Sequence, residues 1–117
     1  MKIQKKLCIG TVQLGQSYGP QKNKKIISLS ELSKFVNYLK KNKIKYIDTA
    51  LNYNFDERIK NSKISLKEFN IISKVPSPKK FKFDYKKKII IDTKKMLSNL
   101  NVKSLYAVLL HDSKNLK

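Results

Sequence analysis

Short runs rich in β-branched and aromatic residues alternate along the chain with stretches whose apolar residues recur at helical spacing. The strand-like runs cover residues 7–11, 45–50, 69–74 and 105–111. This alternation is typical of βαβ units, in which parallel strands are joined by helices. We therefore expect an α/β fold with about four parallel strands and intervening helices.

Two stretches carry the helical pattern most clearly. Ser28 and Glu31 have the spacing of a capping box, and the helix that they begin is predicted to end near Asn42. Its apolar face consists of Leu32, Phe35, Val36 and Leu39. A second helix is predicted over residues 85–99, and the apolar positions of this helix are Ile89, Thr93, Met96, Leu97 and Leu100. The segment 55–62 has a poorer helical pattern.

Three glycines lie near the start of the chain, at Gly10, Gly15 and Gly19. Their spacing does not give the Gly-x-Gly-x-x-Gly run of a dinucleotide-binding turn. We interpret them as positions of turns and of close backbone approach, with Gly15, Gly19 and Pro20 in a loop after the first strand.

The chain has 117 residues, and its formal net charge of +19 comes from 27 basic and 8 acidic residues. Such a charge attracts nucleic acids and anionic membranes. However, Arg58 is the only arginine, although arginine is the better bidentate ligand for phosphate. Lysine runs such as 86–88 fit a solvated helix face. We therefore predict no nucleic-acid and no membrane partner, and the least favoured alternative is a basic nucleic-acid-binding module, whose binding would depend strongly on salt.

The single cysteine, Cys8, excludes a disulfide or a cysteine metal cluster within this sequence. It favours a reducing, cytoplasmic location. No stretch approaches the ~20 apolar residues that cross a bilayer. The sequence predicts no metal site.

Four residues with acid-base chemistry lie where predicted strands end. These are Asp48, Lys74 and His111 at strand ends, and Tyr53 in the loop after the second strand. Taken singly, each has an ordinary explanation, as a loop cap, as one of many lysines, as a lone structural histidine or as one of 6 tyrosines. Their joint order favours one catalytic site, because barrel enzymes place their active sites at the carboxyl ends of parallel strands.

The order and spacing of these residues resemble the aldo-keto reductase family. Residues 46–50, followed by Tyr53 and Glu57, are similar to the family's Asp-Thr-Ala-x-x-Tyr signature. Residues 73–74 and 109–111 are similar to its lysine and histidine segments. The opening residues 10–15 and 18–19 resemble a bacterial subgroup associated with sugar or cell-surface polysaccharide metabolism.

This resemblance implies a (β/α)8 TIM barrel, which needs about 250 residues. Residues 1–117 would then form the N-terminal half of the barrel as one domain. It also implies NADPH-dependent reduction of an aldehyde or ketone. In that reaction Tyr53 would donate a proton with the help of Lys74, Asp48 would hold Lys74, and His111 would orient the small-molecule carbonyl. No cofactor-binding residue is identified, because the family's main cofactor contacts come from later strands.

Two features depart from a complete family member. Asn54 stands where the family usually has glycine, and we expect it to keep the turn because asparagine tolerates left-handed backbone angles. A sheet of about four parallel strands would also leave its outer edges unpaired. Two further hypotheses follow: the chain associates with itself or with a complementing half-barrel, or it is a truncated, catalytically inactive remnant.

Overall fold

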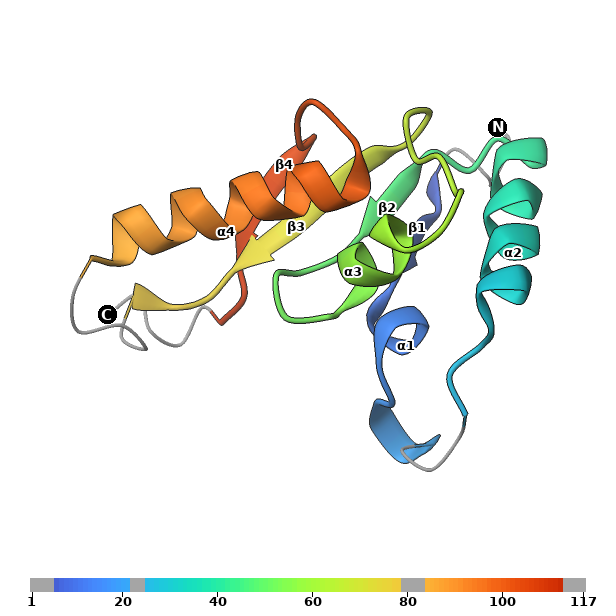
Figure 1. Cartoon of the computed structure of the whole chain (residues 1–117), viewed down its shortest axis with the longest axis horizontal. Helices are drawn as coiled ribbons and strands as arrows, with labels where there is room; N and C mark the ends of the chain where they lie inside the picture. Colours follow the sequence, from blue (N-terminus) through green and yellow to red (C-terminus); the bar gives the residue numbers. More distant parts are fainter. Residues whose placement is uncertain (1–5, 22–24, 79–83, 113–117) are drawn as a thin grey trace.

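The computed structural model describes residues 6–21, 25–78 and 84–112 of the chain. Within these ranges four parallel strands form one sheet in the order β1-β2-β3-β4 (Figure 1). The strands are β1 (Cys8–Gly10), β2 (Tyr46–Asp48), β3 (Asn70–Val75) and β4 (Ala107–Leu110). The predicted α/β fold with parallel strands is therefore confirmed, although three of the strands are shorter than the sequence runs suggested.

Helices occupy the connections between successive strands. They are α1 (Val12–Gly15), the 3-10 turn η2 (Gly19–Gln21), α2 (Leu29–Lys41), α3 (Phe55–Lys60) and α4 (Tyr85–Leu100). The predicted loop after the first strand is wrong in part, because α1 and η2 interrupt it. Both elements are too short to show a helical period in the sequence.

The capping box of α2 is present in full. The Ser28 hydroxyl accepts from the Glu31 backbone N–H at 3.1 Å, and the Glu31 carboxylate accepts from the Ser28 N–H at 2.7 Å. These bonds satisfy two of the donors that a helix start leaves unpaired. Of the predicted apolar face, Leu32, Val36 and Leu39 are buried.

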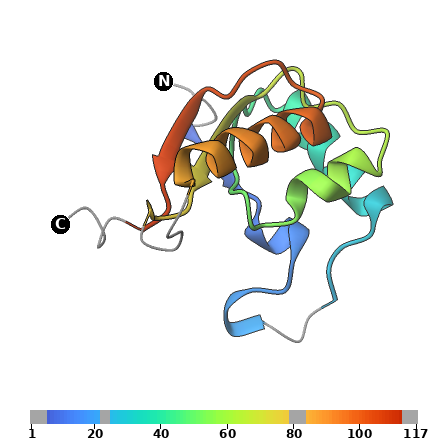
Figure 2. The same cartoon turned by 60° about the vertical axis from the view of Figure 1, so that its left-hand side comes forward.

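The α4 helix begins and ends close to its predicted limits, and its buried residues lie near its C-terminal end. Met96, Asn99 and Leu100 are buried, whereas Ile90 and Ile91 are 44% and 55% exposed. Both Figure 1 and Figure 2 show α4 lying alongside β3 and β4. Lysines 86–88 are exposed on its first turns, so the prediction of a solvated helix face is confirmed.

The core lies between the helices and one face of the sheet. Ile47 of β2 and Ile71 of β3 point toward it and are each 1% exposed. They pack in one cluster with residues of α2, α3 and α4, and this cluster includes Leu32, Phe55 and Leu100. Because side chains alternate across a strand, Asp48 and Lys74 lie on the opposite face, which we call the open face. No helix of the described residues is long and apolar enough to span a membrane.

The three glycines have different structural roles. A Cβ on Gly15 would lie 2.7 Å from the Phe55 amide nitrogen and would overlap the Tyr53 carbonyl, so close backbone approach is confirmed there. Gly19 has a φ of +76°, which fits a turn. The interpretation of Gly10 is wrong: it is a strand residue, and nothing lies within 4 Å of a Cβ built on it.

Candidate active site

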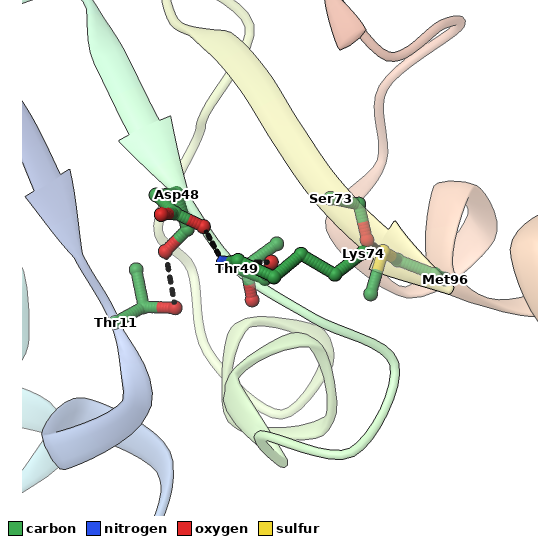
Figure 3. Close-up of polar contacts among 6 residues, drawn as sticks. All are labelled: Thr11, Asp48, Thr49, Ser73, Lys74 and Met96. Atoms are coloured by element: carbon green, nitrogen blue, oxygen red, sulfur yellow. Dashed lines mark hydrogen bonds and ion pairs between the residues drawn. The ribbon is translucent and has the colours of Figure 1, made fainter. Parts of the chain in front are cut away.

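Asp48 and Lys74 form an ion pair at the carboxyl ends of β2 and β3 (Figure 3). Asp48 follows the core residue Ile47 in β2, and Lys74 follows the buried Ser73 in β3. Because side chains alternate along a strand, both Asp48 and Lys74 lie on the open face. The Lys74 ammonium also donates to the Thr49 carbonyl oxygen at 3.3 Å. The Lys74 side chain is 17% exposed and that of Asp48 is 35% exposed, so the pair is only partly screened by solvent.

The end of β1 fixes the backbone of Asp48. The Thr11 amide and the Thr11 hydroxyl both donate to the Asp48 carbonyl oxygen at 3.0 Å, and Figure 3 shows the bond from the hydroxyl. Thr11 is itself only 1% exposed. The two bonds hold the C-terminal end of β2 against β1. They thereby limit the positions that the Asp48 side chain can adopt.

Tyr53 and His111 complete a continuous cluster with the ion pair. The Lys74 ammonium lies 5.3 Å from the centroid of the Tyr53 ring, within the range of a cation–π contact. The Tyr53 and His111 rings meet edge to face, with centroids 5.7 Å apart and planes at 88°. His111 directly follows β4, where its amide donates to the Val75 carbonyl at 2.9 Å. The structure thus brings together all four residues that the sequence suggested.

The turn after Tyr53 adopts the backbone that its asparagine was expected to provide. Asn54 has a φ of 58°, in the left-handed region, and α3 begins at the next residue. Asparagine visits this region more readily than other non-glycine residues, so the family's usual glycine is replaced without loss of the turn.

A cavity of about 480 Å³ opens beside the cluster. Its volume lies within the range of small-molecule sites. It is lined by Lys74 and His111 together with Leu51, Asn52, Pro76, Ser77, Asp92 and Asp112. Tyr53 does not line it, but its ring contacts two residues that do. The cavity therefore gives a small molecule access to the edge of the acid-base cluster.

The charges of the ion pair extend along the open face to Cys8. Partial desolvation raises the pKa of the Cys8 thiol above its ordinary value of 9.0, the Asp48 carboxylate raises it further, and the Lys74 ammonium opposes both. This keeps the thiol protonated near neutral pH. Across residues 6–21, 25–78 and 84–112, no group of three histidine, cysteine or acidic side chains is placed to hold a metal ion.

Sequence reasoning missed the residues that support the cluster. Thr11 stands in the opening motif but was given no role, and its bond to Asp48 joins residues 37 apart in the chain. Asn99 donates to the buried Asp56 carboxylate at 2.7 Å and thereby links α4 to α3. The signals in the sequence were the polar Asn99 among the apolar residues of α4 and the acidic Asp56 in the first turn of α3.

Parallel βα units with an acid-base cluster at the carboxyl ends of the strands are the arrangement found in α/β-barrel enzymes. The chain belongs to the aldo/keto reductase family, whose model matches residues 6–116. Two solved structures assigned as an aldo-keto reductase from Pseudomonas aeruginosa share the fold, each with a TM-score of 0.69 over 90% of this chain. Their sequences are 24% and 23% identical to it.

The chain spans 42% and 40% of the length of these two structures. It therefore corresponds to part of their barrel. A comparison with curated proteins gives no significant match.

Proposed function

We propose that this chain supplies the acid-base site of an NADPH-dependent oxidoreductase that reduces an aldehyde or ketone. The observation that carries the proposal is the continuous cluster of Asp48, Lys74, Tyr53 and His111 on the open face, beside a cavity of suitable size. Family membership supports it, because aldo-keto reductases generally use NADP(H).

Each residue has a distinct task in the proposed reaction. The nicotinamide cofactor, when bound, supplies the hydride that reaches the carbonyl carbon. Tyr53 donates its phenolic proton to the carbonyl oxygen, which gives an alcohol, and later takes a proton from solvent. The Lys74 ammonium, which lies over the Tyr53 ring, stabilises the negative charge that the phenol acquires.

The other two residues orient the reacting groups. Asp48 keeps the Lys74 ammonium in place through their ion pair. His111 lines the cavity and touches the Tyr53 ring, so it is placed to hydrogen-bond the carbonyl oxygen of a bound substrate. The site would thus contact the substrate oxygen from two sides.

The open face offers space for the nicotinamide end of the cofactor. Gly10 is in register with Asp48, and nothing lies within 4 Å of a Cβ built on it. Gly10 would therefore border a flat ring placed against the sheet. The described residues contain no glycine-rich phosphate loop and no arginine cluster, so we assign no residue to the cofactor phosphates.

We propose a hydroxyl-rich carbonyl compound, such as a sugar derivative, as the substrate class. Asn52, Asp92 and Asp112 add polar side chains to the lining of the cavity, and side chains of this kind suit hydroxyl groups as ligands. The similarity of residues 10–15 to a sugar-associated bacterial subgroup supports the same choice. Comparing reduction rates for sugar-derived and simple aldehydes tests this class directly.

We also propose that further βα units complete the site, either from a complementing half-barrel or from a second copy of the chain. β4 lies at one edge of the sheet, and its Val108 and Leu109 are 51% and 48% exposed. Unpaired edges with exposed apolar residues favour pairing with another strand. Light scattering of the purified protein, alone and with NADPH, measures the assembly that forms.

The first test replaces Tyr53 by phenylalanine, which removes the proton donor and keeps the ring. We expect NADPH oxidation with a carbonyl substrate to fall by at least about 100-fold, which is the lower end of the range for general acid–base catalysis. Cofactor binding, followed by the fluorescence of NADPH, should remain unchanged because the ring still packs against Lys74 and His111.

Tyr38→Phe is the matched control, because Tyr38 lies on α2 and is 60% exposed. It should leave turnover unchanged. Turnover by Tyr53→Phe at the rate of the unmodified protein would show that Tyr53 is not the donor. Absence of turnover in the unmodified protein, with every carbonyl compound and with NADPH bound, would contradict the proposed activity itself.

A further inference from the structure

Arg58 joins three segments that are distant in the sequence. From α3, its Nη1 donates to the Leu14 carbonyl and its Nη2 to the Ile27 carbonyl, both at 2.5 Å. The two acceptors lie 44 and 31 residues away from Arg58 in the chain. One guanidinium therefore attaches both the end of α1 and the segment before α2 to the helix that follows Tyr53.

The Leu14 contact bears directly on the loop that carries Tyr53. Gly15, the next residue, lies so close to this loop that a Cβ on it would overlap the Tyr53 carbonyl and lie 2.7 Å from the Phe55 nitrogen. Asn54 also donates through its side chain to Gln16 at 3.5 Å. The position of α1 therefore constrains the position of residues 53–55, and Arg58 holds α1 through its bond to the Leu14 carbonyl.

The choice of arginine follows from this geometry. The remaining basic residues of the chain are lysines, 27 basic residues being present in all. A lysine ammonium is a single point of charge, whereas a guanidinium presents separate nitrogens in a rigid fork. The fork donates to two carbonyls of different segments through two separate nitrogens, whereas a lysine would have to reach both carbonyls from a single nitrogen.

We propose that Arg58 is a positioning residue for Tyr53: its two hydrogen bonds keep α1 against the Tyr53 loop and so hold the phenol ring against Lys74 and His111. Arg58 does not line the cavity beside the cluster and has no place in the proton transfer. The effect of Arg58 on carbonyl reduction rests on the proposed function. The effect of Arg58 on the position of the Tyr53 ring is independent of that function.

His111 gives a direct readout of that position. It is the only histidine in the chain, so its C2–H proton gives one assignable NMR resonance. The Tyr53 ring meets the imidazole at 5.7 Å, close enough to shift this resonance through its ring current. The difference between the unmodified protein and Tyr53→Leu, measured at a pH where the imidazole is neutral, defines the shift that Tyr53 causes.

The experiment compares Arg58→Lys with Lys60→Gln, a change of an exposed lysine on the same helix. We expect Arg58→Lys to lose more than half of the Tyr53-dependent shift and Lys60→Gln to retain it. Hydrogen exchange at the amides of residues 53–55 should rise about tenfold in Arg58→Lys, with α4 unchanged, because local opening is set by local contacts.

In an active preparation, Arg58→Lys should lower kcat about tenfold and leave NADPH affinity unchanged, since misplacement of a catalytic group affects the chemical step. A retained His111 shift in Arg58→Lys would overturn the proposal. Faster exchange throughout α4 as well would also overturn it, by showing a general loss of stability. An inactive unmodified protein would contradict the proposed function, and the NMR comparison would still decide the role of Arg58.

Discussion

The two faces of the sheet use the same strands for different purposes. In β3, Ser73 faces the helices and is 1% exposed, with its hydroxyl 3.3 Å from the Met96 sulfur. The next residue, Lys74, faces the other way and pairs with Asp48. The helix face thus supplies packing that stabilises the fold, and the open face supplies charged groups. Residues that are neighbours in one strand contribute to these two different properties. This separation lets the chemistry be changed without loss of the core.

The largest expected difference in stability comes from truncating one leucine in the core, on the helix side of the sheet, and one leucine on the open face. Leu32 is fully buried and Leu109 is 48% exposed at β4. We expect Leu32→Ala to lower the free energy of unfolding by about 3 kcal/mol, because it leaves a cavity in the core. Leu109→Ala should change it by less than about 0.5 kcal/mol. Urea denaturation followed by circular dichroism measures both.

Equal losses in these two variants would break the comparison, since they would place Leu109 in a packed environment. A loss confined to Leu109→Ala that depends on protein concentration would show that the open face is covered in an assembly.

A smaller effect is expected at the contact between α3 and α4. Asn99 donates to the carboxylate of Asp56, which is 8% exposed. Asn99→Ala removes a hydrogen bond to a buried charge, and we expect a loss of about 2 kcal/mol in the free energy of unfolding. Because α3 begins two residues after Tyr53, the His111 resonance should shift as well.

Asp56→Asn with Asn99→Ala provides the control, because the double variant leaves no unpaired carboxylate. It should recover part of the loss. If Asn99→Ala is as stable as the unmodified protein, the polar contact contributes nothing, and apolar packing alone holds α3 against α4.

The smallest effect is a dependence on pH at the exposed start of α2. Hydrogen bonds from Ser28 lower the pKa of Glu31 below its ordinary value of 4.5. A carboxyl group with a lowered pKa stabilises the folded chain above its unfolded pKa, and this stabilisation is lost as the pH falls through the folded pKa. The stability difference between the unmodified protein and Glu31→Gln should therefore disappear in acid.

Ser28→Ala separates the two partners of the capping box. In a Ser28→Ala background, the Glu31→Gln change should alter the pH dependence less, because the Ser28 hydroxyl is lost, but the effect should persist, because the Ser28 backbone N–H, the largest cause of the lowered pKa, remains. Equal pH dependence in the two backgrounds would show that the Ser28 hydroxyl contributes nothing and would leave the backbone N–H and the neighbouring lysines as the causes.

Local sequence signals predicted the helices whose start, end and apolar face are encoded in their own residues. The capping box and the apolar spacing placed the start of α2 at Leu29 and its end within a residue of Asn42. The limits of α4 were also predicted closely. α1 could not be predicted, because its 4 residues have no measurable period and depend on contact with the Tyr53 loop.

The site was predictable through motif order, and its supports were not. Asp48, Lys74, Tyr53 and His111 lie together because their strands are parallel and in register, which the alternating pattern indicated. Their catalytic roles stay a prediction. Arg58 and Thr11 act through acceptors 31 to 44 residues away, and no local pattern reports such distances.

The strand order has a consequence for how the protein folds during its synthesis on the ribosome. Because β1, β2, β3 and β4 are neighbours in the order in which they are made, each emerging strand finds its partner already present. Synthesis would deliver Asp48 first, Tyr53 soon after, Lys74 with the third strand and His111 last. A nascent chain thus assembles the Asp48–Lys74 pair well before His111 is added, and the cluster is complete only when the fourth strand has left the exit tunnel.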